Sequence, residues 1–339
     1  MKNQRGVALI SVLLITTIIV SILTGIFYRQ SLAQERLFQS LLTDQAALIG
    51  YSAEDWVAQR LIEDANRSSY DSLSESWAQA LPPLPVENGV LSGRLTDLQS
   101  RVNLNRFTAF TPEKTQAARG EPRSDYFLIE RLFRQAGYPL SDAQLDGLID
   151  WQDPDDQITG QGAESPEYQL SDTPYRTANG ELVALYELLS IQGFDSSVLE
   201  RISPWVNVLP RTVRQINVNT APAQVLMALC ASIDQASADR LIEIRAEHPW
   251  TNVAAFYRSL AETLQLDSER QAQALVRGEG FDPITVSSDY FQLEMKLELG
   301  GRVFNLESVL HRVKVEKKIS VNVISRSLQM VNETLGEAA

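Results

Sequence analysis

The chain is poor in the residue types on which most enzymes and disulfide-linked proteins depend. Its 339 residues include one cysteine and two histidines. A single cysteine cannot form an internal disulfide, and because Cys230 ends an apolar stretch we expect a buried thiol. His248 precedes a proline, His311 lies in a strand-like segment, and no glycine-rich phosphate loop opens a helix. We therefore expect no enzymatic activity; a carboxylate pair of the glycosidase kind has no positive evidence.

An excess of positive charge is also missing. The chain carries 43 acidic residues against 30 lysines and arginines, a formal net charge of -13. Proteins that bind nucleic acid usually present a basic patch to the phosphates, so nucleic acid is not expected as a partner of the chain as a whole. The mixture of 44% apolar and 22% charged residues is typical of a globular protein with a real core.

Charged residues are absent from residues 7–28, a run of 22 residues. About 20 apolar residues suffice for a helix to cross a bilayer, whereas the apolar region of a secretory signal peptide has about 7 to 15. Lys2 and Arg5 precede the run and Arg29 follows it. The excess of positive charge on the N-terminal side predicts a single-pass anchor with the large C-terminal part outside the cytoplasm.

The leader, residues 1–6, ends in Gly6 directly before Val7-Ala8-Leu9-Ile10, and this junction resembles the type III signal of type IV pilins and pseudopilins. The resemblance implies that a prepilin peptidase cleaves after Gly6 and methylates Val7. An ordinary signal anchor is the alternative. Most members of that family carry glutamate at the fifth mature position, where this chain has Ser11. A carboxylate in hydrocarbon needs a partner, so a subunit with no neighbour ahead of it has no use for that charge.

The apolar run continues as an amphipathic pattern, with apolar residues mostly three, four or seven apart among polar ones. We expect one helix from Val7 to Glu63, roughly 85 Å long at about 1.5 Å per residue. In a filament, the apolar residues Leu37, Leu41 and Trp56 of this continuation would pack against helices of partner subunits.

Strand patterns stand near residue 90 and beyond residue 285. Pro82, Pro83 and Pro85 are expected to end the helical region, and loose alternation over residues 89–98 predicts a first strand or strand pair. The strongest hairpin pattern joins residues 290–299 to 302–306 through Gly300-Gly301. Two further segments, residues 311–315 and 319–324, complete an antiparallel meander.

The residues between these strands read as helices with short polar links. Helices are expected over residues 127–136, 142–151, 181–191, 221–231, 236–246 and 252–260. The predicted fold class is α+β: a pilin fold, with a long N-terminal helix and an antiparallel sheet, and a large all-α domain inserted into the sheet region. The expected division is a leader (1–6), a transmembrane part (7–28), the pilin helix and first strands (29–105), the inserted α-helical calcium-binding domain (106–280) and the C-terminal strands (281–339).

A weak internal repeat joins Val102-Asn103-Leu104-Asn105 to Ile216-Asn217-Val218-Asn219, and each copy precedes a helical pair. With the leader that lacks glutamate and the acidic segment Asp150-Trp151-Gln152-Asp153, these segments resemble the GspK family, the large minor pseudopilins of type II secretion systems.

That resemblance implies a subunit at the tip of the pseudopilus that initiates or caps assembly for protein export across the outer membrane. Its implied location is the inner membrane, with the soluble domain in the periplasm. The implied partners are minor pseudopilins of the I and J type, the major pseudopilin, the prepilin peptidase and the inner-membrane assembly platform.

An acidic region lies within the expected helical domain: residues 135–200 contain 13 acidic side chains and one basic one, Arg176. Asp153, Asp155, Gln157, Thr159 and Glu164 stand at offsets 1, 3, 5, 7 and 12, as in an EF-hand loop, but Ile158 occupies the position of the required glycine. A solvated acidic loop is the alternative.

We expect an oxygen-rich calcium site for one or two ions, and the GspK resemblance also implies calcium in this region. The candidate ligands are Asp153, Asp155, Asp156, Thr159, Glu164, Asp172 and Asn179.

The second Asn-rich segment and the helices after it also resemble the helix-hairpin-helix of DNA receptors. Such a motif needs a glycine in the hairpin and basic residues near phosphate. Here the link contains Asp234 and no glycine, and Arg240 and Arg245 stand among acidic residues. We interpret it as a packing module; a membrane-anchored DNA-binding receptor remains the alternative function.

Overall fold

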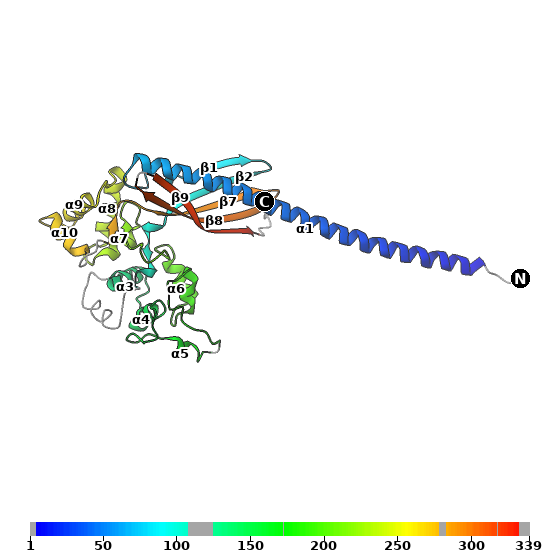
Figure 1. The fold of residues 1–339 in the computed structure, drawn as a ribbon, viewed down its shortest axis with the longest axis horizontal. Coiled ribbons are helices and arrows are strands. Elements are labelled where there is room, and N and C mark those ends of the chain that lie inside the picture. Colours follow the sequence, from blue (N-terminus) through cyan, green and yellow to red (C-terminus); the bar gives the residue numbers. More distant parts are fainter. Residues whose placement is uncertain (1–4, 108–124, 172, 278–282, 317, 332–339) are drawn as a thin grey trace.

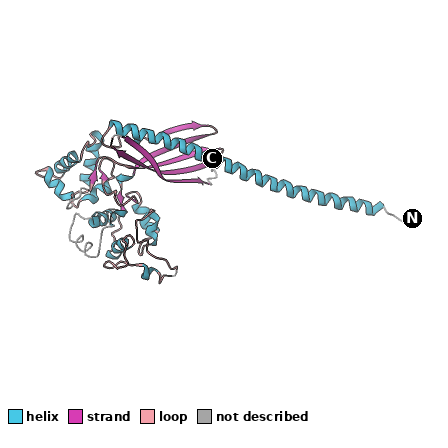
Figure 2. Cartoon of the chain, viewed as in Figure 1, coloured by secondary structure: helices cyan, strands magenta, loops and turns pink. Residues whose placement is uncertain are grey.

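The protein consists of a long helix, a five-stranded sheet and a helical part, here described from a computed structural model (Figure 1). The description covers residues 5–107, 125–171, 173–277, 283–316 and 318–331. Helix and strand are segregated along the molecule, with the sheet packed on the long helix and most other helices gathered beyond the sheet (Figure 2). The α+β fold class expected from the sequence is confirmed.

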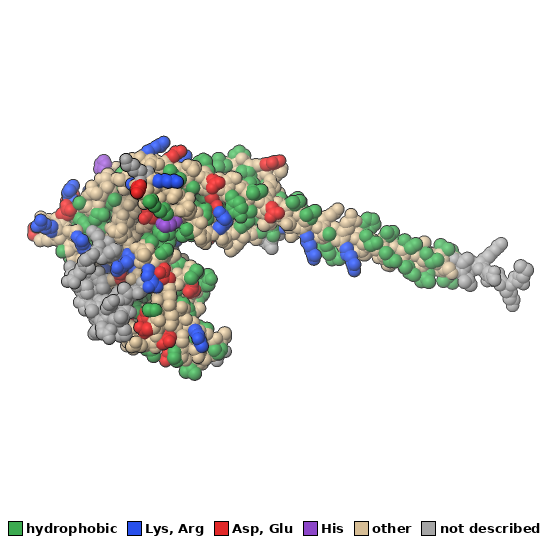
Figure 3. All heavy atoms as spheres, viewed as in Figure 1, with side chains coloured by type: hydrophobic (Ala, Val, Ile, Leu, Met, Phe, Trp, Pro, Cys, Tyr) green, Lys and Arg blue, Asp and Glu red, His purple; other side chains and the backbone are tan. Residues whose placement is uncertain are grey.

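The long helix α1 runs without a break from Arg5–Arg67. Its N-terminal half projects alone, and hydrophobic side chains cover it (Figure 3). Within the described residues, one helix is long and apolar enough to cross a membrane, and it is this one. Its C-terminal half packs on the sheet through Leu42, Ala46, Val57 and Leu61. Gly50 permits the close approach, since a Cβ there would lie 2.7 Å from the Leu306 side chain.

The sheet is antiparallel throughout, in the order β1-β2-β7-β8-β9. Its strands are β1 (Leu81–Val86), β2 (Gly89–Asp97), β7 (Tyr290–Leu299), β8 (Arg302–Val315) and β9 (Lys318–Val331). Alternate residues of β2, β7 and β8 face α1 and form an apolar core, whereas their neighbours face away. The β7–β8 turn consists of Gly300 and Gly301, both at positive φ, as the two-residue hairpin turn requires.

The three prolines correct one sequence expectation. The helix ends at Arg67, well before them, and Pro82, Pro83 and Pro85 lie in the edge strand β1. Proline has no N–H to donate, which an edge strand tolerates because one of its sides has no partner strand. The β1–β2 register is accordingly irregular between Leu81 and Leu84.

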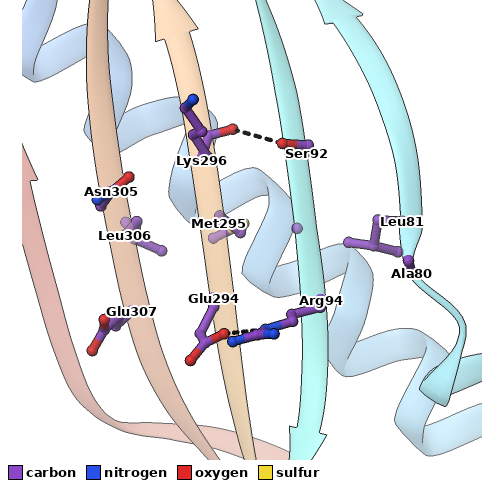
Figure 4. Close-up of a pocket in the computed structure, with 11 residues that line it drawn as sticks. Ala80, Leu81, Ser92, Arg94, Glu294, Met295, Lys296, Asn305, Leu306 and Glu307 are labelled. Atoms are coloured by element: carbon purple, nitrogen blue, oxygen red, sulfur yellow. Dashed lines mark hydrogen bonds and ion pairs between the residues drawn. The ribbon is translucent and has the colours of Figure 1, made fainter. Parts of the chain in front are cut away.

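The face of the sheet opposite α1 is polar. Arg94 of β2 pairs with Glu294 of β7, and the Ser92 hydroxyl donates to the carbonyl oxygen of Lys296 (Figure 4). Asn305 and Glu307 of β8 line the same shallow pocket. Both partners of the ion pair are partly exposed, so it contributes little to stability.

The helical part lies between β2 and β7 in the sequence and has its own apolar core, which extends from Val102 to Val286. Its described helices are α3 (Asp125–Gln135), α4 (Asp142–Asp150), α5 (Ser165–Tyr168), α6 (Ser196–Ile202), α7 (Ala223–Leu229), α8 (Gln235–Glu247), α9 (Val253–Thr263) and α10 (Glu269–Val276). Two short parallel pairs join β3 (Val102–Asn103) to β4 (Val206–Asn207) and β5 (Ile216–Asn217) to β6 (Ile284–Thr285).

The helix expected over residues 181–191 is wrong: only a 3-10 turn, Leu185–Ser190, forms there. The Asn105 side chain binds both backbone groups of Leu182: its oxygen accepts from the Leu182 N–H at 2.8 Å, and its amide donates to the Leu182 carbonyl at 2.9 Å. The Glu187 carboxylate binds the N–H groups of Val183 and Ala184. These contacts hold the backbone in an extended form that a helix would exclude.

The sequence repeat is a structural repeat. Asn219 accepts from the N–H of Trp250 and donates to its carbonyl, as Asn105 does with Leu182. In each copy the first asparagine, Asn103 or Asn217, accepts from the N–H two residues later. Each copy thus consists of an Asn-rich segment, a helical pair and a return segment that the second asparagine fastens.

Asp97, at the end of β2, joins the sheet to the helical part. Its carboxylate is buried and accepts hydrogen bonds from Asn217, Thr220 and Ser288. Burial raises the pKa of Asp97 to about 6, partly offset by the Ser288 and Thr220 hydroxyls.

Candidate metal centre

Helix α4 delivers the first side chain of a buried carboxylate cluster. The helix starts with a capping box in which Ser141 and Gln144 satisfy each other's backbone N–H. Leu145, Leu148 and Ile149 face the core, so the last turn leaves Asp150 pointing into the loop that follows. This loop contributes Asp153 at its start and Glu164 at its end.

Asp150, Asp153 and Glu164 converge, with one carboxylate oxygen of each lying within 4.8 Å of the others. Their exposed fractions are 0%, 3% and 0%. Neither oxygen of Asp153 nor Oε1 of Glu164 accepts a hydrogen bond from the described residues. Buried polar groups are nearly always satisfied, so these oxygens are available as ligands for a cation.

The raised pKa values of these three carboxyl groups also favour a cation as their ligand. Burial, followed by the neighbouring carboxylates, raises the pKa of Glu164 to about 8 and that of Asp153 to about 6. Burial also raises the pKa of Asp150 to about 7, against hydrogen bonds from Thr159. The cluster is therefore costly while ionised and without a counter-charge, and a bound divalent cation with oxygen ligands would neutralise it.

The predicted ligands separate into two groups. Asp153, Thr159 and Glu164 lie at the cluster, where the Thr159 N–H donates to Asp150 at 3.0 Å. Asp155 and Asp156 lie at its rim, and the Asn179 amide donates to the carbonyl of Asp155 and the carboxylate of Asp156. Gln157, which the EF-hand offsets include, is exposed. Asp172 lies outside the described residues.

Sequence reasoning missed Asp150 as a ligand candidate. Its signal was the i, i+3 spacing to Asp153 at the end of a helix, which brings the two side chains to the same side. Gly162 was a second signal: a Cβ there would lie 2.1 Å from Oδ2 of Asp150. The loop therefore crosses directly over the carboxylate where only glycine fits. Thr177 was also missed; its hydroxyl donates to Glu164 at 3.4 Å.

In the helix-hairpin-helix candidate, α7 and α8, one of the two arginines is buried and the other stands at the surface beside an acidic residue. Arg245 is buried and donates to the carbonyl oxygen of Val218 at 2.6 Å. Arg240 pairs with Glu243 on the same helix. Arg245 is thus withheld from solvent and the charge of Arg240 is offset by Glu243, which favours the interpretation of this segment as a packing module over the DNA-binding alternative.

The residues predicted to mediate assembly lie on the surface of α1. Ser11 is exposed on its projecting half, and Leu37, Leu41 and Trp56 are 61%, 58% and 43% exposed. Trp56 borders an apolar groove between α1 and the β1–β2 edge, which Ile49 and Leu84 also line. Gly6 belongs to the first turn of α1, directly before Val7.

Family models described as type II secretion system protein K match residues 100–211 and 216–278. The type II secretion system protein K of Pseudomonas aeruginosa is 29% identical over 337 residues, covering 96% of this chain and 93% of its own. That of Aeromonas hydrophila is 28% identical, covering 94% and 96%. That of Pectobacterium carotovorum is 27% identical, covering 91% and 93%.

The fold is similar to a chain in the crystal structure of the GspK-GspI-GspJ complex from the type 2 secretion system of enterotoxigenic Escherichia coli. The TM-score is 0.71 at 22% identity, and the match covers 87% of this chain and 99% of that one. At this identity the likeness supports the fold, including the helical part between the strands.

Proposed function

Because the chain belongs to the type II secretion system protein K family, we propose that it is a minor pseudopilin at the tip of the pseudopilus, where it initiates or caps assembly during protein export. The observation that carries this proposal is the combination of an exposed apolar helix half with a bulky helical part at the far end of the molecule.

The projecting half of α1 anchors the protein in the inner membrane as a single pass, with the sheet and helical part in the periplasm. Its exposed aliphatic side chains have no partner among the described residues, and hydrocarbon or other helices would remove them from water. Prepilin peptidase cleavage after Gly6 would make Val7 the methylated N-terminus. Ser11 then occupies the fifth mature position, where a glutamate would need the N-terminal amine of a neighbouring subunit as its partner.

The tip position follows from shape. The helical part lies beyond the sheet, at the end of the molecule opposite the N-terminus (Figure 1). In a filament whose subunits stack along their N-terminal helices, this bulk occupies the place of the next subunit above. The exposed residues Leu37, Leu41 and Trp56 remain for contact with the I-type and J-type pseudopilins beside and below.

The carboxylate cluster would hold calcium. Asp150, Asp153 and Glu164 supply hard oxygen ligands, and Asp155, Asp156, Thr159 and Asn179 stand close enough in the loop to complete a set. The ion's role is structural: it offsets the repulsion within the cluster and fixes residues 151–181 against α4.

The test is assembly with partners. The full chain is co-expressed with the I-type and J-type pseudopilins of the same system and purified in detergent micelles. Trp56→Asp should cost about 2 kcal/mol or more, about a 30-fold loss of affinity, as expected for a buried interface tryptophan. Leu170→Asp is the control, because it also replaces an exposed apolar side chain with a carboxylate but lies in the helical part, away from α1.

Absence of a complex, or a complex indifferent to Trp56→Asp and Leu41→Asp alike, would contradict the proposal. Mass spectrometry of the mature N-terminus provides the second check. A chain that begins with methylated Val7 supports pilin-type processing, and an intact leader contradicts it.

A further inference from the structure

A second carboxylate cluster lies far from the first in the fold, where α1 ends. One oxygen from each of Asp64, Asp71 and Glu75 lies within 4.8 Å of the others. Asp64 belongs to the last turn of α1, and the other two to the segment that follows. Arg312 of β8 reaches the same place, so the cluster stands at the junction of the long helix, the sheet and the helical part.

The hydrogen bonds of this cluster leave one buried oxygen of Asp71 without any partner among the described residues. Asp71 Oδ2 accepts from the Ser288 N–H at 2.7 Å and pairs with Arg312 at 2.5 Å. Glu75 Oε2 accepts from the Ser72 N–H at 2.7 Å and from the Trp77 indole at 3.2 Å. Asp71 Oδ1 and Asp64 Oδ2 are buried and accept no hydrogen bond from the described residues, although Arg312 Nη1 lies 3.8 Å from Asp64 Oδ2 in an ion pair.

Asp71 is 1% exposed, so its free oxygen has neither water nor a donor. Such an atom is rarely left unsatisfied in a folded protein, and an unseen ion or water is the usual explanation. The Asp150, Asp153 and Glu164 cluster has the same two features, converging carboxylates and buried free oxygens.

Charge favours a cation over a neutral ligand. Three carboxylates face one guanidinium, and Arg67, which is near in sequence, is turned to solvent and to Glu63. Burial, then Glu75 and Asp71, raise the pKa of Asp64 to about 7 in spite of Arg312 and Arg67. A small polar cavity lined by Ser68, Asp289 and Lys314 opens beside Asp71 and Arg312.

We infer that Asp64, Asp71 and Glu75 form a second divalent-cation site, with calcium as the ion that three carboxylate oxygens suit best. One carboxylate oxygen of each residue is its ligand, among them the unpartnered Oδ1 of Asp71, while Arg312 pairs with Oδ2 of Asp71. The site is independent of the cluster on α4, because it shares no residue or element with it.

The ion would stiffen the junction of the two parts of the protein. The backbone carbonyl of Asp71 accepts from the Asn217 amide at 3.1 Å, and its side chain binds Ser288, so Asp71 already contacts the helical part. A cation that joins Asp71 to Asp64 fastens that contact to the last turn of α1. The site would thus set the direction of the helical part relative to the long helix.

The experiment measures calcium stoichiometry on the full chain in detergent micelles, by equilibrium dialysis with calcium-45. Glu164→Gln removes a ligand of the first cluster and provides the background. In this background we expect one bound ion, whose affinity falls about tenfold or more with Glu75→Gln. Glu63→Gln, an exposed carboxylate one residue before Asp64, is the control and should change nothing.

Terbium luminescence supplies a second readout. Trp77 contacts Glu75 through its indole, so terbium bound at this site should emit by energy transfer when tryptophan is excited. In the Glu164→Gln background, Trp77→Phe should remove that emission while calcium binding persists. Emission that survives Trp77→Phe, no calcium bound in the background protein, or binding indifferent to both Glu75→Gln and Asp71→Asn would each overturn the inference.

Discussion

Replacing Glu164 with glutamine should have opposite effects on the protein with and without calcium. The side chain is fully buried, its Oε1 has no hydrogen-bond donor among the described residues, and Asp150 and Asp153 face it. Without calcium, the pKa of Glu164 is raised to about 8, so folding near pH 7 has to protonate this carboxyl; glutamine removes that cost and keeps an oxygen for the Thr177 hydroxyl. We expect the free energy of unfolding to rise by about 1–3 kcal/mol in chelator.

With calcium, the sign reverses. A ligand present at 100 times its dissociation constant stabilises the folded state by about 2.7 kcal/mol. For a folded unit of roughly 150–250 residues, that corresponds to an increase in Tm of about 5–10 °C. Glu164→Gln should lose most of this increment because it removes one of three carboxylate ligands.

Thermal unfolding of the full chain in detergent micelles, followed by near-ultraviolet circular dichroism with chelator and then with excess calcium, measures both effects. Glu200→Gln, an exposed carboxylate of α6, is the control and should behave as the unchanged protein. Equal calcium-induced shifts in the Glu164→Gln and unchanged proteins, or a Tm indifferent to chelator, would refute the reasoning about the cluster.

Three further substitutions test the fold by urea unfolding. Asn105→Ala should lower the free energy of unfolding by about 2–3 kcal/mol, since both backbone groups of Leu182 lose their partner; a loss below 0.5 kcal/mol would count against the fastening role. In the folded protein Asp97 holds its proton up to about pH 6, whereas the unfolded chain releases it near pH 4. The free energy of unfolding, compared with that of Asp97→Asn, should therefore fall by up to about 3 kcal/mol as pH rises from 4 to 6. A difference that does not change with pH would contradict the raised pKa. Leu61→Ala should cost about 2–5 kcal/mol by opening a cavity under α1, whereas Leu48→Ala, which is 65% exposed, should cost little; equal losses would contradict the packing of α1.

Local patterns predicted the elements whose burial is regular. The uncharged run and its amphipathic continuation predicted α1, and the alternation that follows the first two residues of 290–299 predicted β7, because each pattern is local in the sequence. The helix over residues 181–191 failed since the decisive contact comes from Asn105, a residue distant in sequence. The prolines of β1 were misread because an edge strand tolerates what a central strand does not.

The carboxylate cluster lies in the acidic region that the sequence singled out, but its members differ from the predicted set of calcium ligands. Acidic residues without lysine located the region, and Asp153 and Glu164 lie in the cluster. The EF-hand offsets assume one loop geometry, whereas this loop returns over Asp150 through Gly162. The cluster of Asp64, Asp71 and Glu75 has no sequence signal of its own, because the end of a helix and Arg312 of a distant strand bring it together.

The two copies of the repeat differ in the length of the loop that the second asparagine closes, and therefore in the conformational entropy that loop closure costs. In the second copy, residues 248 and 249 separate α8 from the fastened Trp250, whereas in the first copy residues 151–181 separate α4 from the fastened Leu182. By the logarithmic dependence on length, closing the longer loop costs about 2 kcal/mol more. A cation that binds the folded but not the unfolded chain returns about the same amount when its concentration is about 30 times its dissociation constant. A calcium ion bound by the acidic loop would therefore offset the entropy that the longer loop of the first copy costs.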